Sequence, residues 1–282
     1  MQVVKKFIPI IVPQKYYVDQ YGHPNAFHEN NISLYITDHK VIILIRQVNY
    51  RKFHNKNYIV GHDKSLSEYV MLSGPDFDHL KYQEMIYDWN DFPAHPAYWK
   101  GMDDIRFITD KLILPIISER NEEGKPCLFL ADLNNHIIKI TAKLDPHVIE
   151  KNWMPYIHHD EIKVIYSVSP FVIKSLMIDN RKIINDCQHL KGYHGSTNGI
   201  AYHDGYLFII HLYQQFTVHR WLYFNPDTLE IKVSEPFRFF EHSFIEFNCS
   251  LCWYQNDIIA ALAVNETQVM LSVIDPTTIN LI

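Results

Sequence analysis

The fold is decided by residues 31–46, which read NISLYITDHKVIILIR. Two runs rich in apolar and β-branched residues flank a polar turn at Asp38, which is the pattern of a β-hairpin. The same pattern returns at Asp104–Ser118, Trp153–Ser167, Thr197–His211 and Cys249–Val264. The turns lie roughly 45 to 70 residues apart, the period expected of four-stranded propeller blades. The sequence therefore predicts an all-β fold, a five-bladed β-propeller formed by residues 1–282 as a single domain.

Segments between the hairpins are expected to supply the outer strands of the blades, for example residues 126–133 with 137–142 and residues 220–224 with 229–233. The longest interruption, around residues 50–100, is rich in histidine, aspartate and aromatic residues, and we expect a rim insertion there. Helical periodicity is weak and favours a helix only at Ser65–Leu72 and His79–Asp88.

Composition and charge exclude several classes of protein. With 282 residues, of which 47% are hydrophobic and 21% charged, the chain can bury a large core, and this excludes intrinsic disorder. A formal charge of -6 without clustered lysine and arginine predicts no nucleic-acid partner. Residues 1–13 combine a short apolar run with two prolines, a pattern of neither a signal peptide nor a membrane span. We therefore expect a cytoplasmic protein with no membrane partner.

The cysteines and histidines do not form a recognisable metal motif. Cys249 and Cys252 are two of only four cysteines, and they lie within a hydrophobic segment rather than before a helix. A redox or zinc role for this pair needs further partners, so we expect reduced thiols in the core. The histidines fall on different predicted turns, whereas a metal site needs convergent ligands. The sequence predicts no metal and no cofactor.

Polar residues open each of the five hairpins. Because the innermost strand of a blade starts near the central channel, these residues should meet at one funnel. They are Asn31 and Ser33, Asp103 and Asp104, Lys151 and Asn152, Ser196 and Thr197, and Asn248. The adjacent carboxylates at 103 and 104, followed by Arg106, could support acid catalysis at such a rim, or they form an ordinary surface salt bridge.

Three stretches carry a resemblance to a known family. They are GMDDIR at residues 101–106, EKNWMP at residues 150–155, and the fourth hairpin, which ends at His211. In this order they resemble the five-bladed propellers of glycoside hydrolase family 130 and their bacterial and viral relatives. That family includes mannoside phosphorylases and hydrolases, and related propellers include mannosyltransferases that use activated mannose. The chain departs from the family pattern at residues 31–33, which lack a proline, and at residues 194–197, where HGST replaces an Arg-Gly-Gly motif.

The resemblance implies roles for individual residues. Asp104 matches the general acid of the phosphorylases, Asp103 stands where the family usually has glutamate, and Arg106 would hold the pair in position. Cationic positions near an anion or sugar subsite are matched by Arg46, Lys151 and His211, and sugar-contacting positions by Asn49, Tyr50 and Asn152. The expected substrate-binding residues are these six together with Asn31, Arg106, His194 and Thr197.

Breaking a glycosidic bond requires a proton for the leaving oxygen, and the attacking group decides what else is needed. Two neighbouring carboxylates cannot both ionise cheaply in a partly desolvated funnel, so one of them, expected to be Asp104, keeps its proton. If water attacks, Glu150 is the nearest candidate for the base. If phosphate is the co-substrate, or a nucleotide sugar is the donor, the cationic residues hold the phosphate groups.

These patterns predict a carbohydrate-active enzyme that cleaves or transfers a glycosyl unit, with a mannosyl unit as the first candidate. Its partner is a carbohydrate substrate, joined by phosphate or a nucleotide sugar in two of the three reactions. Two alternatives stay open: a propeller glycosyltransferase that uses an activated sugar donor, and a non-catalytic propeller that binds a glycan or a protein.

Overall fold

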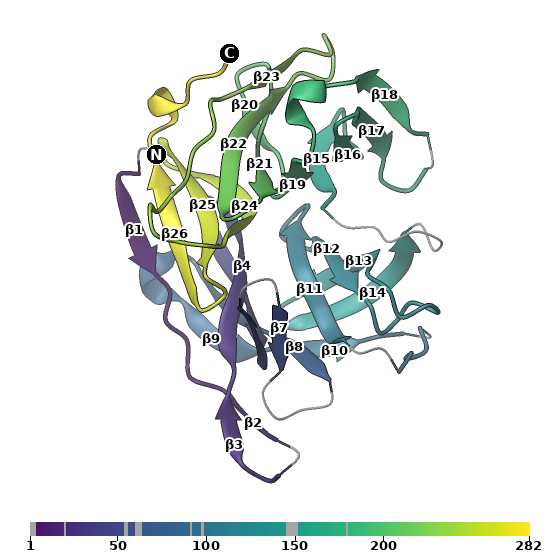
Figure 1. Ribbon diagram of the computed structural model, residues 1–282, viewed down its shortest axis with the longest axis vertical. Coiled ribbons are helices and arrows are strands. Elements are labelled where there is room, and N and C mark those ends of the chain that lie inside the picture. The colour runs from purple at the N-terminus through teal and green to yellow at the C-terminus, as the bar shows by residue number, and fades with distance from the viewer. Residues whose placement is uncertain are drawn as a thin grey trace.

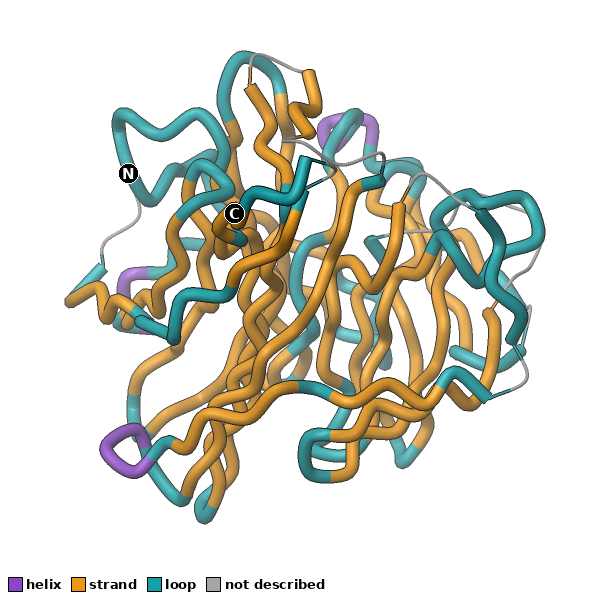
Figure 2. The backbone as a smooth tube through the Cα atoms, turned by 90° about the horizontal axis from the view of Figure 1, so that it is seen from below, coloured by secondary structure: helices purple, strands orange, loops and turns teal. Residues whose placement is uncertain are grey.

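The computed structural model describes residues 4–19, 21–53, 56–59, 64–90, 92–96, 99–144, 152–178 and 180–282. Within these ranges β-strands dominate, as Figure 2 shows, and the helices are short 3₁₀ helices at Phe77–His79 (η1), Gln188–Leu190 (η2) and Pro276–Thr278 (η3). None of the described helices is long and apolar enough to cross a membrane. The prediction of an all-β fold is confirmed.

The largest sheet has nine strands. One part of it contains β4 (His28–Thr37), β5 (Lys40–Val48), β8 (Ser65–Gly74) and β9 (Lys81–Glu84). The other part contains β10 (Ile86–Asp88), β11 (Trp99–Phe107), β12 (Leu112–Ile117), β13 (Cys127–Asn134) and β14 (Ile137–Leu144). The two parts join where β8 and β11 run parallel over a short stretch.

Three smaller sheets follow along the chain. The first contains β15 (Met154–His158), β16 (Glu161–Val168), β17 (Phe171–Ser175) and β18 (Lys182–Asn185). The second contains β19 (His194–Gly195), β20 (Ile200–Tyr202), β21 (Gly205–Tyr213), β22 (Thr217–Phe224) and β23 (Ile231–Val233). The third contains β24 (Glu246–Tyr254), β25 (Asp257–Val264), β26 (Gln268–Ile274) and β1 (Lys6–Pro9). Two-stranded sheets are formed by β2 (Tyr16–Val18) with β3 (Pro24–Ala26) and by β6 (Tyr50–Phe53) with β7 (Lys56–Ile59).

The predicted hairpins are all present in the described residues. They are β4–β5, β11–β12, β15–β16, β20–β21 and β24–β25, and each pairs antiparallel. The outer strands expected at residues 126–142 and 220–233 are confirmed as β13–β14 and β22–β23. The number of blades stays a prediction, because the β8–β11 pairing merges two antiparallel units into one sheet.

The expectation for residues 50–100 is wrong in part. Ser65–Leu72, where a helix was expected, lies in strand β8 (Ser65–Gly74), which pairs with β5 from Ser67 to Gly74. Residues 81–88, also expected to be helical, form β9 and β10. Within this range the small β6–β7 hairpin forms a separate sheet, whereas β8 belongs to the main one and is mostly buried. A strand that is apolar on both faces loses its alternation and can be mistaken for a helix.

The first and last sheets pack against each other. Leu34 and Ile43 of the first hairpin share one apolar cluster with Ala261 and Leu271 of β25 and β26. Full burial of a leucine or isoleucine side chain contributes roughly 1.5–3 kcal/mol to stability. In addition, β1 from the N-terminal part of the chain pairs antiparallel with β26. Figure 1 shows this purple strand beside the yellow one, so strands from both ends of the chain complete one sheet.

The cysteines agree with the expectation of reduced core thiols. All four are free and buried. Burial raises the pKa of Cys252 to about 12 and raises that of Cys249 as well. Both thiols are therefore protonated and unsuited to redox chemistry in the folded protein.

Candidate active site

A cavity of about 340 Å³ gathers residues from four different sheets. Its described lining consists of Asn30, Asn31, Arg46, Tyr50, Asp103, Asp104, Asn152, His211, Tyr213, Thr217, Ile245, Glu246, Phe247, Ala263 and Glu266. Asn31, Arg46, Tyr50, Asp103, Asp104, Asn152 and His211 are candidate site residues from the sequence. Residues more than 150 positions apart in the chain thus meet at one place, as the radial arrangement of hairpins requires.

Asp103 and Asp104 both line the cavity although they are consecutive strand residues, which ordinarily point to opposite faces of a sheet. A β-bulge explains this, because the register between β11 and β12 shifts between Asp103 and Arg106. Asp104 has a φ of 29°, an uncommon value for a residue other than glycine. The bulge turns a second carboxylate toward the cavity, as bulges beside active sites do.

Side chains from the neighbouring strands hold the bulge in place. The Ser33 hydroxyl donates to the carbonyl oxygen of Ile105, and the Ile105 N–H donates to the Tyr69 hydroxyl at 3.2 Å. Before the bulge, Gly101 has a φ of 98°, and a Cβ there would overlap the carbonyl oxygen of Ser67. The close approach of β8 and β11 therefore requires glycine, and it brings β11 beside Arg46 of β5.

The Arg46 guanidinium is buried and its donors have defined partners. Nε donates to Ser67 Oγ at 2.7 Å, and Nη1 donates to Asn30 Oδ1 at 2.9 Å. Nη2 donates to the Tyr50 hydroxyl at 2.7 Å and to the Asp103 carboxylate. Burial alone would lower the pKa of Arg46, but the Asp103 carboxylate raises it above its ordinary value, so the guanidinium remains charged.

Arg46 also faces the second carboxylate. Its Nη1 lies 3.5 Å from Asp104 Oδ1, and the Asn31 amide donates to the same oxygen. One guanidinium therefore serves two carboxylates, with the closer contact to Asp103. The cluster becomes electrically neutral when one carboxyl group carries a proton.

Arg106 contacts the backbone of the carboxylate pair, and its described hydrogen bonds do not reach either carboxylate group. Its Nε donates to the carbonyl oxygen of Ser196 at 2.6 Å, and its Nη1 reaches the backbone carbonyl of Asp104 at 3.3 Å. Because of the bulge, the Arg106 side chain points in another direction than the two carboxylates. The arginine that contacts both carboxylates is Arg46.

His211 also lines the cavity, and its Nδ1 is 2.6 Å from the Ser196 hydroxyl. Its ring packs edge-on against Phe247 at 5.1 Å. His194 pairs with His211 in register across β19 and β21 but does not line the cavity. The short contact with Ser196 fixes the orientation of the His211 ring.

Two other candidates are used within the fold instead. The Asn49 side chain donates to the Lys64 carbonyl at 3.1 Å and accepts from the Leu66 N–H at 2.7 Å. The Thr197 hydroxyl accepts from the Ile209 N–H at 3.0 Å and is fully buried. Neither lines the cavity. Glu150 and Lys151, by contrast, lie outside the described residues.

Two acidic residues of the lining were missed in the sequence. Glu246 opens β24, and its carboxylate accepts from the N–H groups of Phe239 and Phe240 at 2.9 and 2.8 Å. Burial would raise the pKa of Glu246, but the contact with His219 at 3.2 Å and these hydrogen bonds lower it. Glu266 is half-buried in the turn between β25 and β26. Glu246 lies two positions before Asn248 and therefore on the same face of the strand, which is the only signal in the sequence that could have indicated it. Nothing in the sequence marked Glu266.

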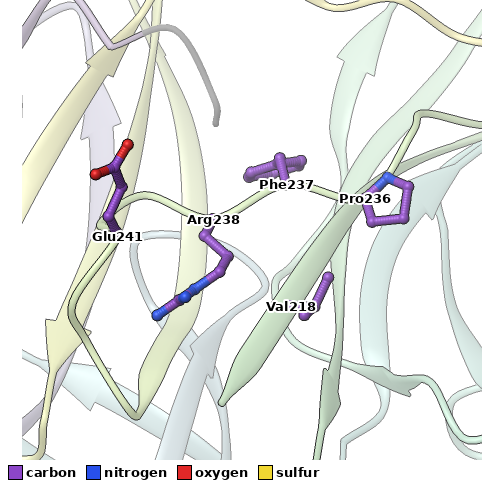
Figure 3. Close-up of a pocket in the computed structure, with 5 residues that line it drawn as sticks. All are labelled: Val218, Pro236, Phe237, Arg238 and Glu241. Carbon is purple, nitrogen blue, oxygen red and sulfur yellow. The ribbon is translucent and has the colours of Figure 1, made fainter. Parts of the chain in front are cut away.

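A second hollow, of about 410 Å³, lies beside Val218, Pro236, Phe237, Arg238 and Glu241 (Figure 3). The Arg238 and Glu241 side chains point in different directions there. Arg238 donates to the carbonyl oxygen of Ser243. No candidate from the sequence lines this hollow, and it has no paired carboxylates among its described residues.

No protein-family model matches the chain, and no curated protein does. Solved structures match over nearly the whole length. One of them belongs to a study of GH130 glycoside hydrolases that target β-1,2 mannosidic linkages in Candida mannan. It has a TM-score of 0.68 at 12% sequence identity, and the match covers 99% of this chain and 96% of the other. The β-1,2-mannobiose phosphorylase of Listeria innocua has a TM-score of 0.64 at 11% identity, covering 97% and 95%.

The mannose phosphorylase MPT-4 of Leishmania mexicana, solved with phosphate, has a TM-score of 0.60 at 9% identity and covers 100% of this chain and 92% of its own. The chain has the propeller fold of these enzymes. At identities this low the likeness shows the fold alone, and the chemistry must be argued from the cavity of this propeller.

Proposed function

We propose that the propeller is a carbohydrate-active enzyme that cleaves a glycosidic bond in the cavity beside Asp104, with water as the attacking group. The observation that carries the proposal is the pair of adjacent carboxylates that a β-bulge turns into one cavity beside a single buried guanidinium. A volume of about 340 Å³ is within the range of small-molecule sites.

Asp104 is the proposed general acid. Asp103 makes the closer contact with Arg46, whereas Asp104 meets the neutral Asn31 amide and lies 3.5 Å from the guanidinium. Arg46 thus holds Asp104 less tightly than Asp103, so we assign Asp104 as the proton donor of the pair. A protonated carboxyl group facing the cavity can donate to the leaving oxygen of a glycoside.

The charge of the described lining favours a neutral substrate and water over phosphate. Among its described lining residues the acidic side chains are Asp103, Asp104, Glu246 and Glu266, and the arginine or lysine side chain is Arg46. Arg46 already contacts two carboxylates, so it cannot neutralise a phosphate without giving up those contacts. A phosphate ion or nucleotide diphosphate would meet like charges, which disfavour its binding.

The remaining lining suits a sugar. The side chains of Asn31 and Asn152 offer amide groups for hydroxyl groups, and Tyr50 and Phe247 offer aromatic rings. Glu266, whose turn places it at the cavity, is the proposed base for water. Because the structural neighbours include enzymes of mannosides, a β-mannoside is the first substrate to test.

The test is the release of mannose from β-1,2-mannobiose, with and without inorganic phosphate. For Asp104→Asn we expect turnover to fall about 100- to 10,000-fold, the usual contribution of a general acid, while binding of the disaccharide persists. Asp110→Asn is the matched control, since Asp110 lies in the turn of the same hairpin and does not line the cavity. Full activity is expected for this control.

The other outcomes separate the alternatives. Release that requires phosphate would refute the charge argument and indicate a phosphorylase. Transfer only from a nucleotide-linked sugar would indicate a glycosyltransferase. Binding of the disaccharide without turnover by the wild-type protein would indicate a non-catalytic glycan-binding propeller.

A further inference from the structure

Two loops that connect strands of different sheets meet outside the described lining of the cavity. One is the β15–β16 turn, where His159 and Asp160 have left-handed φ values of 50° and 60°. The other follows β22 and contains Asp227. Figure 1 shows the two sheets side by side, and one apolar cluster joins them. The sequence predicted no metal site, but His158 and His159 are consecutive residues, and Asp227 from the loop after β22 lies beside both.

Three side chains converge there with atoms that bind metals. Nε2 of His158 lies 3.2 Å from Asp227 Oδ1, and Nε2 of His159 lies 3.4 Å from the same oxygen. All three ligand atoms lie within 4.8 Å of one another. With metal–ligand distances of about 2.0–2.1 Å, the edges of a tetrahedron around zinc are about 3.3 Å long. The contacts with Asp227 therefore match the spacing of zinc ligands.

The second nitrogen of His158 is oriented by a neighbour. The Tyr206 hydroxyl donates to the carbonyl oxygen of Ile157, so its own oxygen faces His158 Nδ1, at 3.5 Å, as an acceptor. With the proton on Nδ1, Nε2 is the nitrogen available to a metal ion beside the Asp227 carboxylate. Metal-binding histidines are held by an outer contact of this kind.

Burial and access also fit a metal site. The His158 side chain is 12% exposed, whereas His159 and Asp227 are 78% and 62% exposed. One ligand is therefore fixed by packing, and the other two are open to an ion from solvent. Two imidazole nitrogens and one carboxylate suit zinc and similar ions better than magnesium or calcium, which prefer oxygen ligands only.

We propose that His158, His159 and Asp227 bind a divalent transition-metal ion of the zinc type, with water as the fourth ligand. The ion would tie the β15–β16 turn to the loop after β22 and so stabilise the contact between two sheets. Asn152 lines the cavity just before β15, and His158 ends that strand, about 20 Å away at about 3.3 Å per residue. The metal site is therefore separate from the candidate active site.

The experiment is calorimetric titration of zinc chloride into protein freed of metal with EDTA. We expect the wild-type protein to bind one zinc ion, and His159→Asn to lose at least tenfold in affinity. Asparagine tolerates the left-handed backbone at this position, so the turn is kept. The matched control is His203→Asn, because His203 has a φ of 52° in the corresponding turn of the next hairpin. This variant should bind zinc like the wild-type protein, and magnesium chloride should not bind at the site.

Asp227→Asn is a second variant that tests the same site from the other loop. It should also lose at least tenfold in affinity, and its thermal midpoint in EDTA shows whether it is folded. Zinc should raise the midpoint of the wild-type protein and of His203→Asn but not that of His159→Asn. The proposal is overturned if the wild-type protein does not bind zinc, or if His159→Asn and Asp227→Asn bind it as tightly as His203→Asn. In that case the contact is an ordinary ion pair between histidine and aspartate.

Discussion

Replacing Arg46 with methionine tests the buried cluster most directly. The Arg46 side chain is 5% exposed and that of Asp103 is 19% exposed, so the pair lies largely out of water. Removing one partner of a buried ion pair costs about 3–5 kcal/mol, because the other charge stays behind without compensation. At about 2–4 °C per kcal/mol for a chain of this class, the thermal midpoint should fall by about 6–20 °C. The assay is urea and thermal unfolding at pH 7.

A double-mutant cycle isolates the pair from other effects of the substitution. Asp103→Asn removes the orphaned charge, so Arg46→Met with Asp103→Asn should be less destabilised than the sum of the single variants by about 1–3 kcal/mol. Lys232→Met is the control, because Lys232 pairs with Glu230 at the surface, where such contacts contribute at most about 1 kcal/mol. The reasoning is refuted if Arg46→Met costs less than about 1 kcal/mol or if the two effects are additive.

Two further predictions concern the surroundings of the cavity. Gly101→Ala should lower the free energy of unfolding by at least about 2 kcal/mol, because the φ of 98° strains alanine and the new methyl group overlaps the Ser67 carbonyl. Urea unfolding measures this, and an unchanged unfolding curve would contradict it. Glu246→Gln should be less stable than the wild-type protein at pH 7, and this difference in the free energy of unfolding should shrink as the pH falls below about 4.5. Unfolding measured at pH 7, 5 and 3.5 tests this. The sign follows because contact with His219 lowers the pKa of Glu246 in the folded state, so its stabilisation is present above the unfolded value and lost when the carboxylate is protonated. A difference that does not change with pH would contradict it.

The strands could be predicted from the sequence because their signals are local. Each hairpin shows two apolar runs around a polar turn, as in residues 31–46, and the turn residues need no distant partner. Ser65–Leu72 misled the prediction because Tyr69–Leu72 of β8 are apolar and buried on both faces, and the strand is fixed by pairing with β5 and β11. Tertiary context decided that segment, and no local pattern contained it.

The candidate site could be predicted in outline but not in its contacts. Asp103 and Asp104 were placed at the funnel, and they do line the cavity. Their partner was expected to be Arg106, the nearest arginine in sequence, whereas Arg46 is separated from Asp103 by 57 positions and contacts it. A bulge changes the direction of every side chain beyond it, and the sequence does not mark the bulge.

Residues in turns were the least visible from the sequence. Glu266 resembles any acidic turn residue, since polar turns are common whether or not they face a cavity. Asp227 belongs to an Asn-Pro-Asp turn that indicates only a change of chain direction. Their importance depends on which loop of another sheet lies opposite, and that is a property of the assembled molecule.

The pairing of β1 with β26 also determines how the molecule is expected to aggregate. Without Lys6–Pro9, β26 would expose a row of unpaired N–H and C=O groups, onto which strands of other molecules can add. Detachment of this short segment would thus expose an edge strand that can pair with strands of other molecules. Cleavage near residue 10 should therefore produce aggregates before the interior loses its structure.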